Sequence, residues 1–241
     1  MIFTEERTVE SLDTNSNDII RPSALVRFMQ ECANHNMRAC RPTYEELFAQ
    51  GYAFILSRIA VKCYDVIHPY DSLTVQTWPC HGRGVTFPRS YRIFRDGKIV
   101  AEGDSIWALL DVNNRKLLKN DEIDMSNYTF DEPINLPLRF RIPTDTEFVN
   151  AGKHTVDYSE IDCNMHMNNT NYPDMLCNRI PDIDKKTVRE FTISFVSEAP
   201  YKSELDINIG TNTEESGICY FRTTVGDKVN IEARIVTESV K

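Results

Sequence analysis

The spacing of apolar residues predicts a long helix near the start of the chain. Between residues 22 and 38 the apolar or small residues recur every three or four positions, the period of a helix with one buried face. Pro22 suits the first turn, because the N–H that proline lacks would have no intrahelical acceptor there. A shorter helical turn is predicted for residues 43–48, ended by Gly51.

After Gly51 the apolar period changes to that of strands. Segments rich in Val, Ile, Tyr, Phe and Thr alternate with turns, which predicts one antiparallel sheet. These segments cover residues 54–64, 73–78, 86–94 and 99–111. Residues 120–150 lose the period and carry acidic clusters and prolines, as is typical of a linker.

The rest of the chain repeats this order of elements. It predicts a strand near residues 154–158, a short helix at 171–179, and strands near 187–196, 204–210, 218–225 and 229–238. Two turns also repeat in letters: residues 69–72 recur at 200–203, 131 positions later, and residues 96–99 recur at 226–229, 130 positions later. The sequence therefore predicts an α+β protein made of two copies of a helix-plus-antiparallel-sheet unit, which pair with each other.

Composition and charge exclude several classes of protein. The chain has 241 residues, 41% of them hydrophobic, and a net charge of −9, which does not suit a protein that neutralises nucleic-acid phosphates. No apolar run approaches the ~20 residues that span a bilayer. The first residues lack a basic segment followed by an apolar one, so we expect a cytoplasmic protein without a signal peptide.

The cysteines and glycines predict no metal site and no cofactor. The seven cysteines form an odd set without CxxC spacing, which favours free thiols. Cys163 and His166 have no second pair at zinc-finger spacing. The Gly82-Arg-Gly84 segment lacks the third glycine and the following helix of a dinucleotide-binding loop.

Residues 160–169 hold the densest set of reactive side chains. Asp162, Asn164 and His166 lie between a predicted strand and a predicted helix, where polar groups can meet a developing oxyanion. Asx residues before a helix are also ordinary caps. The repeat adds a partner: at an offset of 131, Glu198 lies opposite Ile67, so a carboxylate replaces an apolar residue in only one half.

The segment Asp162-Cys-Asn164-Met-His166-Met-Asn168-Asn169 resembles the Asp-x-Asn-x-His-x-Asn-Asn signature of acyl-acyl-carrier-protein (acyl-ACP) thioesterases of the hotdog superfamily. Residues 29–35, 77–78, 92–96 and 105–110 resemble the first half of that family. The resemblance implies two tandem hotdog units, each a helix wrapped by an antiparallel sheet. The expected bounds are an N-terminal unit at 1–125, a linker at 126–150 and a C-terminal unit at 151–241. The family's plastid members carry a targeting extension, so a bacterial-type member is expected.

The resemblance also implies the roles of the site residues. Asp162, Asn164 and His166 match the catalytic loop, and Glu198 matches the catalytic glutamate. The family commonly has a cysteine after that glutamate, once proposed as the nucleophile. Here the position holds Ala199, which favours attack by water. Backbone N–H groups at Asn168 and Asn169 are the expected oxyanion donors.

In the family the acyl chain lies in the first half, between its helix and its sheet. The candidates for the pocket wall are Leu25, Phe28, Met29, Ala33 and Trp78. Each of them would also suit a plain core position.

An acidic carrier protein requires a local basic patch on a net-acidic enzyme. The candidates for carrier docking are Arg83, Arg89, Arg92, Arg95, Arg139 and Arg141. Two alternatives stay open: the acyl group rides on coenzyme A instead of a carrier protein, or the chain is a non-catalytic hotdog acyl sensor. The sequence also leaves a homodimer open.

Overall fold

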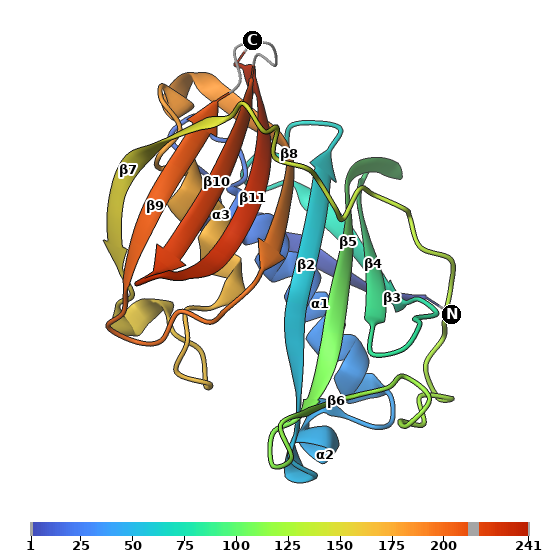
Figure 1. Ribbon diagram of the computed structural model, residues 1–241. Helices are drawn as coiled ribbons and strands as arrows, with labels where there is room; N and C mark the ends of the chain where they lie inside the picture. Colours follow the sequence, from blue (N-terminus) through green and yellow to red (C-terminus); the bar gives the residue numbers. More distant parts are fainter. Residues whose placement is uncertain (1, 212–216, 241) are drawn as a thin grey trace.

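The computed structural model describes residues 2–211 and 217–240. It confirms the α+β class: the strands form one large antiparallel sheet that curves around the helices (Figure 1). No helix among these residues is both long and apolar enough to cross a membrane.

Each half contains a strand, a helix and then four strands in the same order, and the first half adds α2 and β6. The first half contains β1 (Phe3–Thr8), α1 (Pro22–Ala39), α2 (Tyr44–Ala49), β2 (Tyr52–Cys63), β3 (Ser72–Pro79), β4 (Phe87–Arg95), β5 (Lys98–Asp111) and β6 (Lys116–Leu118). The second half contains β7 (Glu147–Thr155), the 3₁₀ turn η3 (Asn169–Asn171), α3 (Tyr172–Cys177), β8 (Lys186–Phe195), β9 (Glu204–Thr211), β10 (Ile218–Val225) and β11 (Lys228–Ser239). Three further 3₁₀ turns are η1 (Ser11–Asp13), η2 (Tyr158–Glu160) and η4 (Ile183–Lys185).

The strand order of the sheet is symmetric about its centre. It runs β1-β3-β4-β5-β2-β8-β11-β10-β9-β7, with β6 paired to β5. In the central antiparallel pair, Ala60 of β2 lies opposite Thr192 of β8. A pseudo-two-fold axis therefore passes between these two residues, and it relates positions of the first half to positions 132 later. The tandem hotdog arrangement follows.

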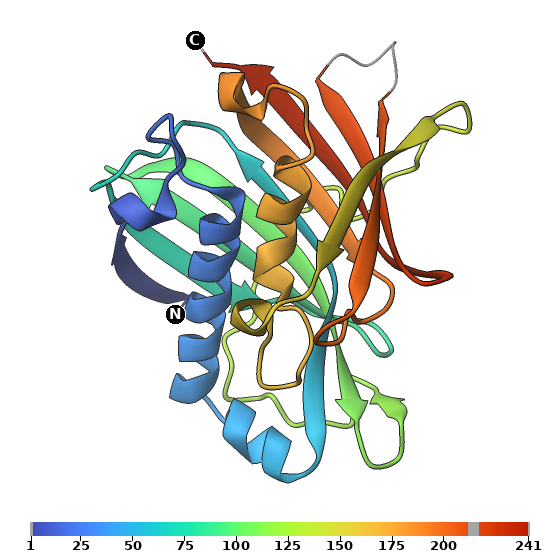
Figure 2. The ribbon, with the colours of Figure 1, turned by 90° about the vertical axis from the view of Figure 1, so that its left-hand side faces the viewer.

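The helices α1 and α3 pack side by side inside the curved sheet (Figure 2). The Ser23 N–H and hydroxyl of α1 both donate to the Asp174 carboxylate of α3, at 3.0 and 2.5 Å. Met29 of α1 is fully buried against β5, where a Cβ at Gly103 would lie 2.8 Å from the Met29 sulfur. The glycine lets the helix approach the sheet closely.

The structure confirms the predicted helices and the interior strands, but it corrects the prediction at the sheet edges. β7 begins at Glu147 and not near residue 154, so it takes up the end of the segment expected to be linker. β1 was not predicted at all. Both strands pair on one side only and are largely polar, because an edge strand needs little apolar alternation.

The structure also corrects the register of the repeat. The Ile20 N–H donates to the Ile67 carbonyl, and the Met167 N–H donates to the Ala199 carbonyl, both at 2.9 Å. Ile67 therefore matches Ala199, and Glu198 matches Val66 instead of Ile67. Pro69 correspondingly matches Tyr201 and not Pro200. The carboxylate still replaces an apolar side chain.

Candidate active site

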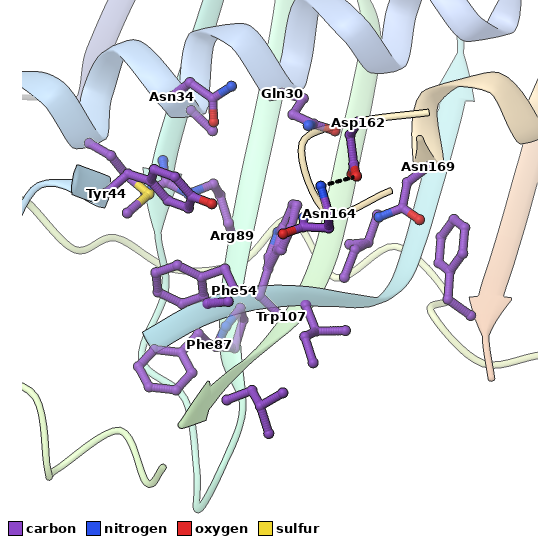
Figure 3. Close-up of a pocket in the computed structure, with 18 of the residues that line it drawn as sticks. Gln30, Asn34, Tyr44, Phe54, Phe87, Arg89, Trp107, Asp162, Asn164 and Asn169 are labelled. Atoms are coloured by element: carbon purple, nitrogen blue, oxygen red, sulfur yellow. Dashed lines mark hydrogen bonds between the residues drawn. The ribbon is translucent and has the colours of Figure 1, made fainter. Parts of the chain in front are cut away.

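A tight loop between β7 and η3 holds the predicted catalytic residues. The Asp162 N–H donates to the His166 carbonyl at 3.0 Å, which closes the loop. The Asp162 carboxylate accepts the Asn164 N–H at 2.8 Å (Figure 3). Met165 reverses the chain with a left-handed φ of 64°. The loop thus orients the Asp162 carboxylate through a hydrogen bond to its own backbone.

The structure brings His166 and Glu198 together. The loop is fastened to the segment after β8, since the Met167 N–H donates to the Ala199 carbonyl. In this arrangement the His166 Nε2 atom lies 3.0 Å from the Glu198 Oε2 atom. The His166 side chain is 30% exposed and the Glu198 side chain 61%, so the pair is in reach of water.

The pair opens into a cavity of about 1100 Å³, the large cavity, built by both halves. The second half supplies the polar loop and the end of β8. The first half supplies α1 and the strands β2, β4 and β5, whose contribution is mainly apolar (Figure 3). The apolar part includes Ala33, Phe54, Leu56, Phe87, Trp107 and Leu110. A polar reaction site thus adjoins a space that suits an acyl chain.

The first half contains a loop of the same backbone form, although the Asp-x-Asn-x-His motif occurs only in the second half. The Asn15 N–H donates to the Ile19 carbonyl at 2.8 Å, and the Asn15 side chain accepts the Asn17 N–H at 2.9 Å. Asp18 holds the left-handed φ of 55°. Each residue of this loop matches the residue 147 positions later in the second half, so Ile19 occupies the place of His166. At this second offset the two segments share an Asx residue at 15 and 162 and an Asn at 17 and 164, which is the one signal of the loop in the sequence.

This first-half loop faces a cavity of about 460 Å³, the small cavity, which Val66 also lines. Asn15, Ile19 and Val66 stand there in place of Asp162, His166 and Glu198. None of these side chains can take a proton from water at neutral pH. At the matched positions, acid–base side chains therefore lie only around the large cavity.

One of the two expected oxyanion donors is not free. The Asn168 N–H donates to the Glu160 carbonyl at 2.8 Å, and the Asn168 side chain caps Thr170. Asn168 thus shapes the loop and cannot offer its N–H to a substrate. The Asn169 N–H has no acceptor within the described part of the chain.

Of the five candidates for the acyl pocket, Ala33 lines the large cavity and the other four do not. Leu25 lines the small cavity. Phe28 and Met29 belong to the core cluster. Trp78 is buried, and its indole N–H donates to the Glu132 carbonyl at 3.0 Å. These four residues are corrected from pocket wall to structural positions.

The apolar wall on β2, β4 and β5 was not predicted from the sequence. Phe54 and Phe87 lie edge to face there, with ring centroids 5.5 Å apart. A bulge between Leu56 and Arg58 shifts the alternation of β2, so a strict period of two assigns the inward face wrongly at this point. No simple signal in the sequence marks the bulge.

The arginines expected to dock a carrier protein have different environments. Arg89 is buried and donates to Asn36 and Thr77, so it is corrected from a docking to an interior position. Burial lowers the pKa of its guanidinium. Arg92 pairs with Glu102, and Arg95 pairs with Asp65 and Asp71. The exposed candidates are Arg83, Arg139 and Arg141.

All seven cysteines are free thiols. Burial raises the pKa of Cys32 and of Cys63 to about 12, so both are protonated at neutral pH. The described residues contain no group of His, Cys, Asp or Glu side chains that could hold a metal ion.

Comparisons with known proteins agree with this geometry. The family model for the acyl-ACP thioesterase N-terminal domain matches residues 1–125, and the model for the C-terminal domain matches residues 144–238. No curated protein sequence matches the chain significantly.

Two solved structures share the fold over almost the whole length. An acyl-ACP thioesterase from Bacteroides thetaiotaomicron is 22% identical, with a TM-score of 0.85, covering 98% of each chain. A 12:0-ACP thioesterase from Umbellularia californica is 17% identical, with a TM-score of 0.80, covering 99% of this chain and 94% of the other. With both domain models matched in order along a tandem hotdog fold, the chain belongs to the acyl-ACP thioesterase family.

Proposed function

We propose that this thioesterase releases free fatty acids from acyl carrier protein by direct attack of water, with Glu198 as the general base. Water adds its oxygen to the thioester carbon, its proton passes to the Glu198 carboxylate, and the carbonyl electron pair moves onto oxygen. The oxyanion then re-forms the carbonyl, the C–S bond breaks, and the proton leaves on the thiol. The products are a fatty acid and the carrier's free thiol.

The remaining loop residues orient these groups. The His166 imidazole, 3.0 Å from Glu198, holds the carboxylate and shares its proton. The Asp162 carboxylate is fixed by the Asn164 N–H, and the Asn164 amide positions the water or the carbonyl. The Asn169 N–H is a donor to the oxyanion. The observation that carries the proposal is the His166–Glu198 pair at the mouth of an apolar cavity.

The test is thiol release from a panel of thioesters. Acyl carrier protein and coenzyme A carrying the same acyl groups are compared over a range of chain lengths. We expect higher kcat/KM for the carrier-bound series. Equal rates for coenzyme A would point to an acyl-CoA thioesterase, and binding without thiol release would point to an acyl sensor.

The carrier's acidic surface requires cationic side chains, and the exposed Arg83, Arg139 and Arg141 remain the candidates. Arg83 follows His81 and Gly82, which line the large cavity, so it is next in sequence to the cavity wall. We also place the enzyme in the cytoplasm, because seven free thiols in one chain are typical of a reducing compartment.

Replacing the cysteines one at a time is expected to leave most of the activity. Ala199 occupies the position of the family's cysteine, and the exposed Cys163 is the one cysteine of the catalytic loop. Cys163→Ser and alanine variants at the other six are therefore predicted to keep kcat within a few fold. Mass spectrometry of enzyme quenched during turnover provides the second readout. An acyl group trapped on any cysteine would overturn water attack.

Changing the volume of the large cavity is expected to shift the preferred acyl length. Ala33→Phe adds a ring to the wall, and Phe54→Ala removes one. A methylene gained or lost in an apolar pocket changes kcat/KM by about 10-fold or more, so the optimum should shorten in the first variant and lengthen in the second. A chain-length series of acyl-ACPs measures this. An unchanged profile in both variants would place the acyl chain elsewhere.

A further inference from the structure

One polar side chain in the wall of the large cavity has no role in the mechanism above. Gln30 lies on α1 in the first half and faces the catalytic loop of the second half (Figure 3). Its Oε1 atom is buried and makes no hydrogen bond to any described residue. The Gln30 side chain as a whole is half-buried, and a buried amide oxygen without a partner costs about 1–3 kcal/mol, so a structural role does not explain this residue.

The pseudo-two-fold symmetry supplies an independent observation. The 147-residue match of the two loops continues into the helices: Ser23 and Thr170 are both buried, as are Met29 and Leu176. On this match Gln30 corresponds to Cys177, which lines the small cavity.

Gln30 shares one property with the catalytic residues: each differs in chemical type from the residue that the symmetry places at the small cavity. Around the large cavity the matched positions hold Gln30, Asp162, His166 and Glu198. Around the small cavity they hold Cys177, Asn15, Ile19 and Val66. At this matched position of the helices, the amide occurs only beside the loop that carries the acid–base residues.

The mechanism lacks a donor where Gln30 lies. The Asn168 N–H is occupied by Glu160, which leaves Asn169 as the one expected backbone donor. α1 packs against η3, and Gln30 of α1 and Asn169 of η3 both line the large cavity. The carboxylates of Asp162 and Glu198 repel a developing oxyanion, so a further hydrogen-bond donor is needed to stabilise it, and the Gln30 amide has two N–H donors.

We propose that the Gln30 side-chain amide donates a hydrogen bond to the thioester carbonyl as it becomes an oxyanion, so that the first half completes the catalytic site of the second. This inference rests on the proposed hydrolysis. Removing one such donor typically lowers kcat by about 10²–10³-fold.

The test uses Gln30→Ala and the nearly isosteric Gln30→Glu, which keeps the shape but replaces the N–H donors with a negative charge. We expect each to lose about 10²-fold in kcat with little change in KM. The control is Gln50→Ala, an exposed glutamine at the end of α2, which should behave as wild type. A Gln30→Glu enzyme within threefold of wild type would overturn the proposal.

Equilibrium binding separates an oxyanion donor from a residue that only shapes the cavity. Two pantetheine-linked probes are compared: an alkyl trifluoromethyl ketone, whose hydrated carbonyl imitates the tetrahedral centre, and an alkyl thioether without a carbonyl. The Gln30 variants should lose about 10²-fold in affinity for the ketone alone. Equal losses for both probes would contradict the proposal. These affinities do not depend on turnover, so a wild-type enzyme that hydrolyses no thioester would refute the proposed function separately.

Discussion

Replacing Glu198 with Gln or His166 with Gln should lower kcat by about 10²-fold or more for every acyl length alike. Gln cannot accept the proton of the attacking water, and in the second variant the carboxylate loses the imidazole 3.0 Å away. Both side chains are partly exposed at the end of the acyl cavity, so the preferred chain length should stay the same. Steady-state kinetics over a series of acyl-ACPs gives the result.

The chain offers a matched control for this pair. His154 and Glu160 in the same half form another close pair, with Nε2 and Oε2 2.9 Å apart, and neither lines the large cavity. His154→Gln should therefore keep near wild-type kcat. If Glu198→Gln instead changes the preferred acyl length while keeping its rate, the functions of the two halves are assigned the wrong way round.

Met29→Ala is expected to destabilise the protein without moving the preferred acyl length. Met29 is fully buried against Gly103 and does not line the large cavity. Truncating such a side chain to Ala costs about 2–5 kcal/mol, because the close contact between helix and sheet leaves a void. Urea unfolding measures the free-energy change.

Phe48→Ala is the control for that measurement, because Phe48 is 56% exposed and its loss should change the free energy of unfolding little. If the Met29→Ala enzyme had normal stability and a shifted chain-length profile, Met29 would line the acyl pocket, as first predicted.

The sequence predicted the elements that bury apolar side chains. α1 and the interior strands carry a clear period because one face of each packs in the core. The edge strands β1 and β7 carry little of that pattern, since one side of each is open. The predicted register of the repeat was wrong by one residue, because it aligned Pro69 with Pro200. The backbone hydrogen bonds instead match Tyr70 with Lys202, both at positive φ.

The catalytic loop was predictable from its motif, but its surroundings were not. Residues 162–166 and Glu198 could be assigned by resemblance, and their approach to one another depends on the Met167–Ala199 hydrogen bond. Gln30 lies more than a hundred positions away on another element, and its spacing in α1 is that of any residue at the edge of a buried face. Arg89 is as cationic as its exposed neighbours, and only the fold shows that it is buried.

The Ala60–Thr192 pairing at the centre of the sheet bears on how such an enzyme can change. In an assembly of two identical subunits, every substitution would appear at both sites, so an altered helix side chain and an altered loop could not be separated. Joining the units in one chain removes that constraint. Gln30 and Ile19 are then independent positions, so the acid–base residues and the proposed Gln30 donor can serve one site without a matching change at the other.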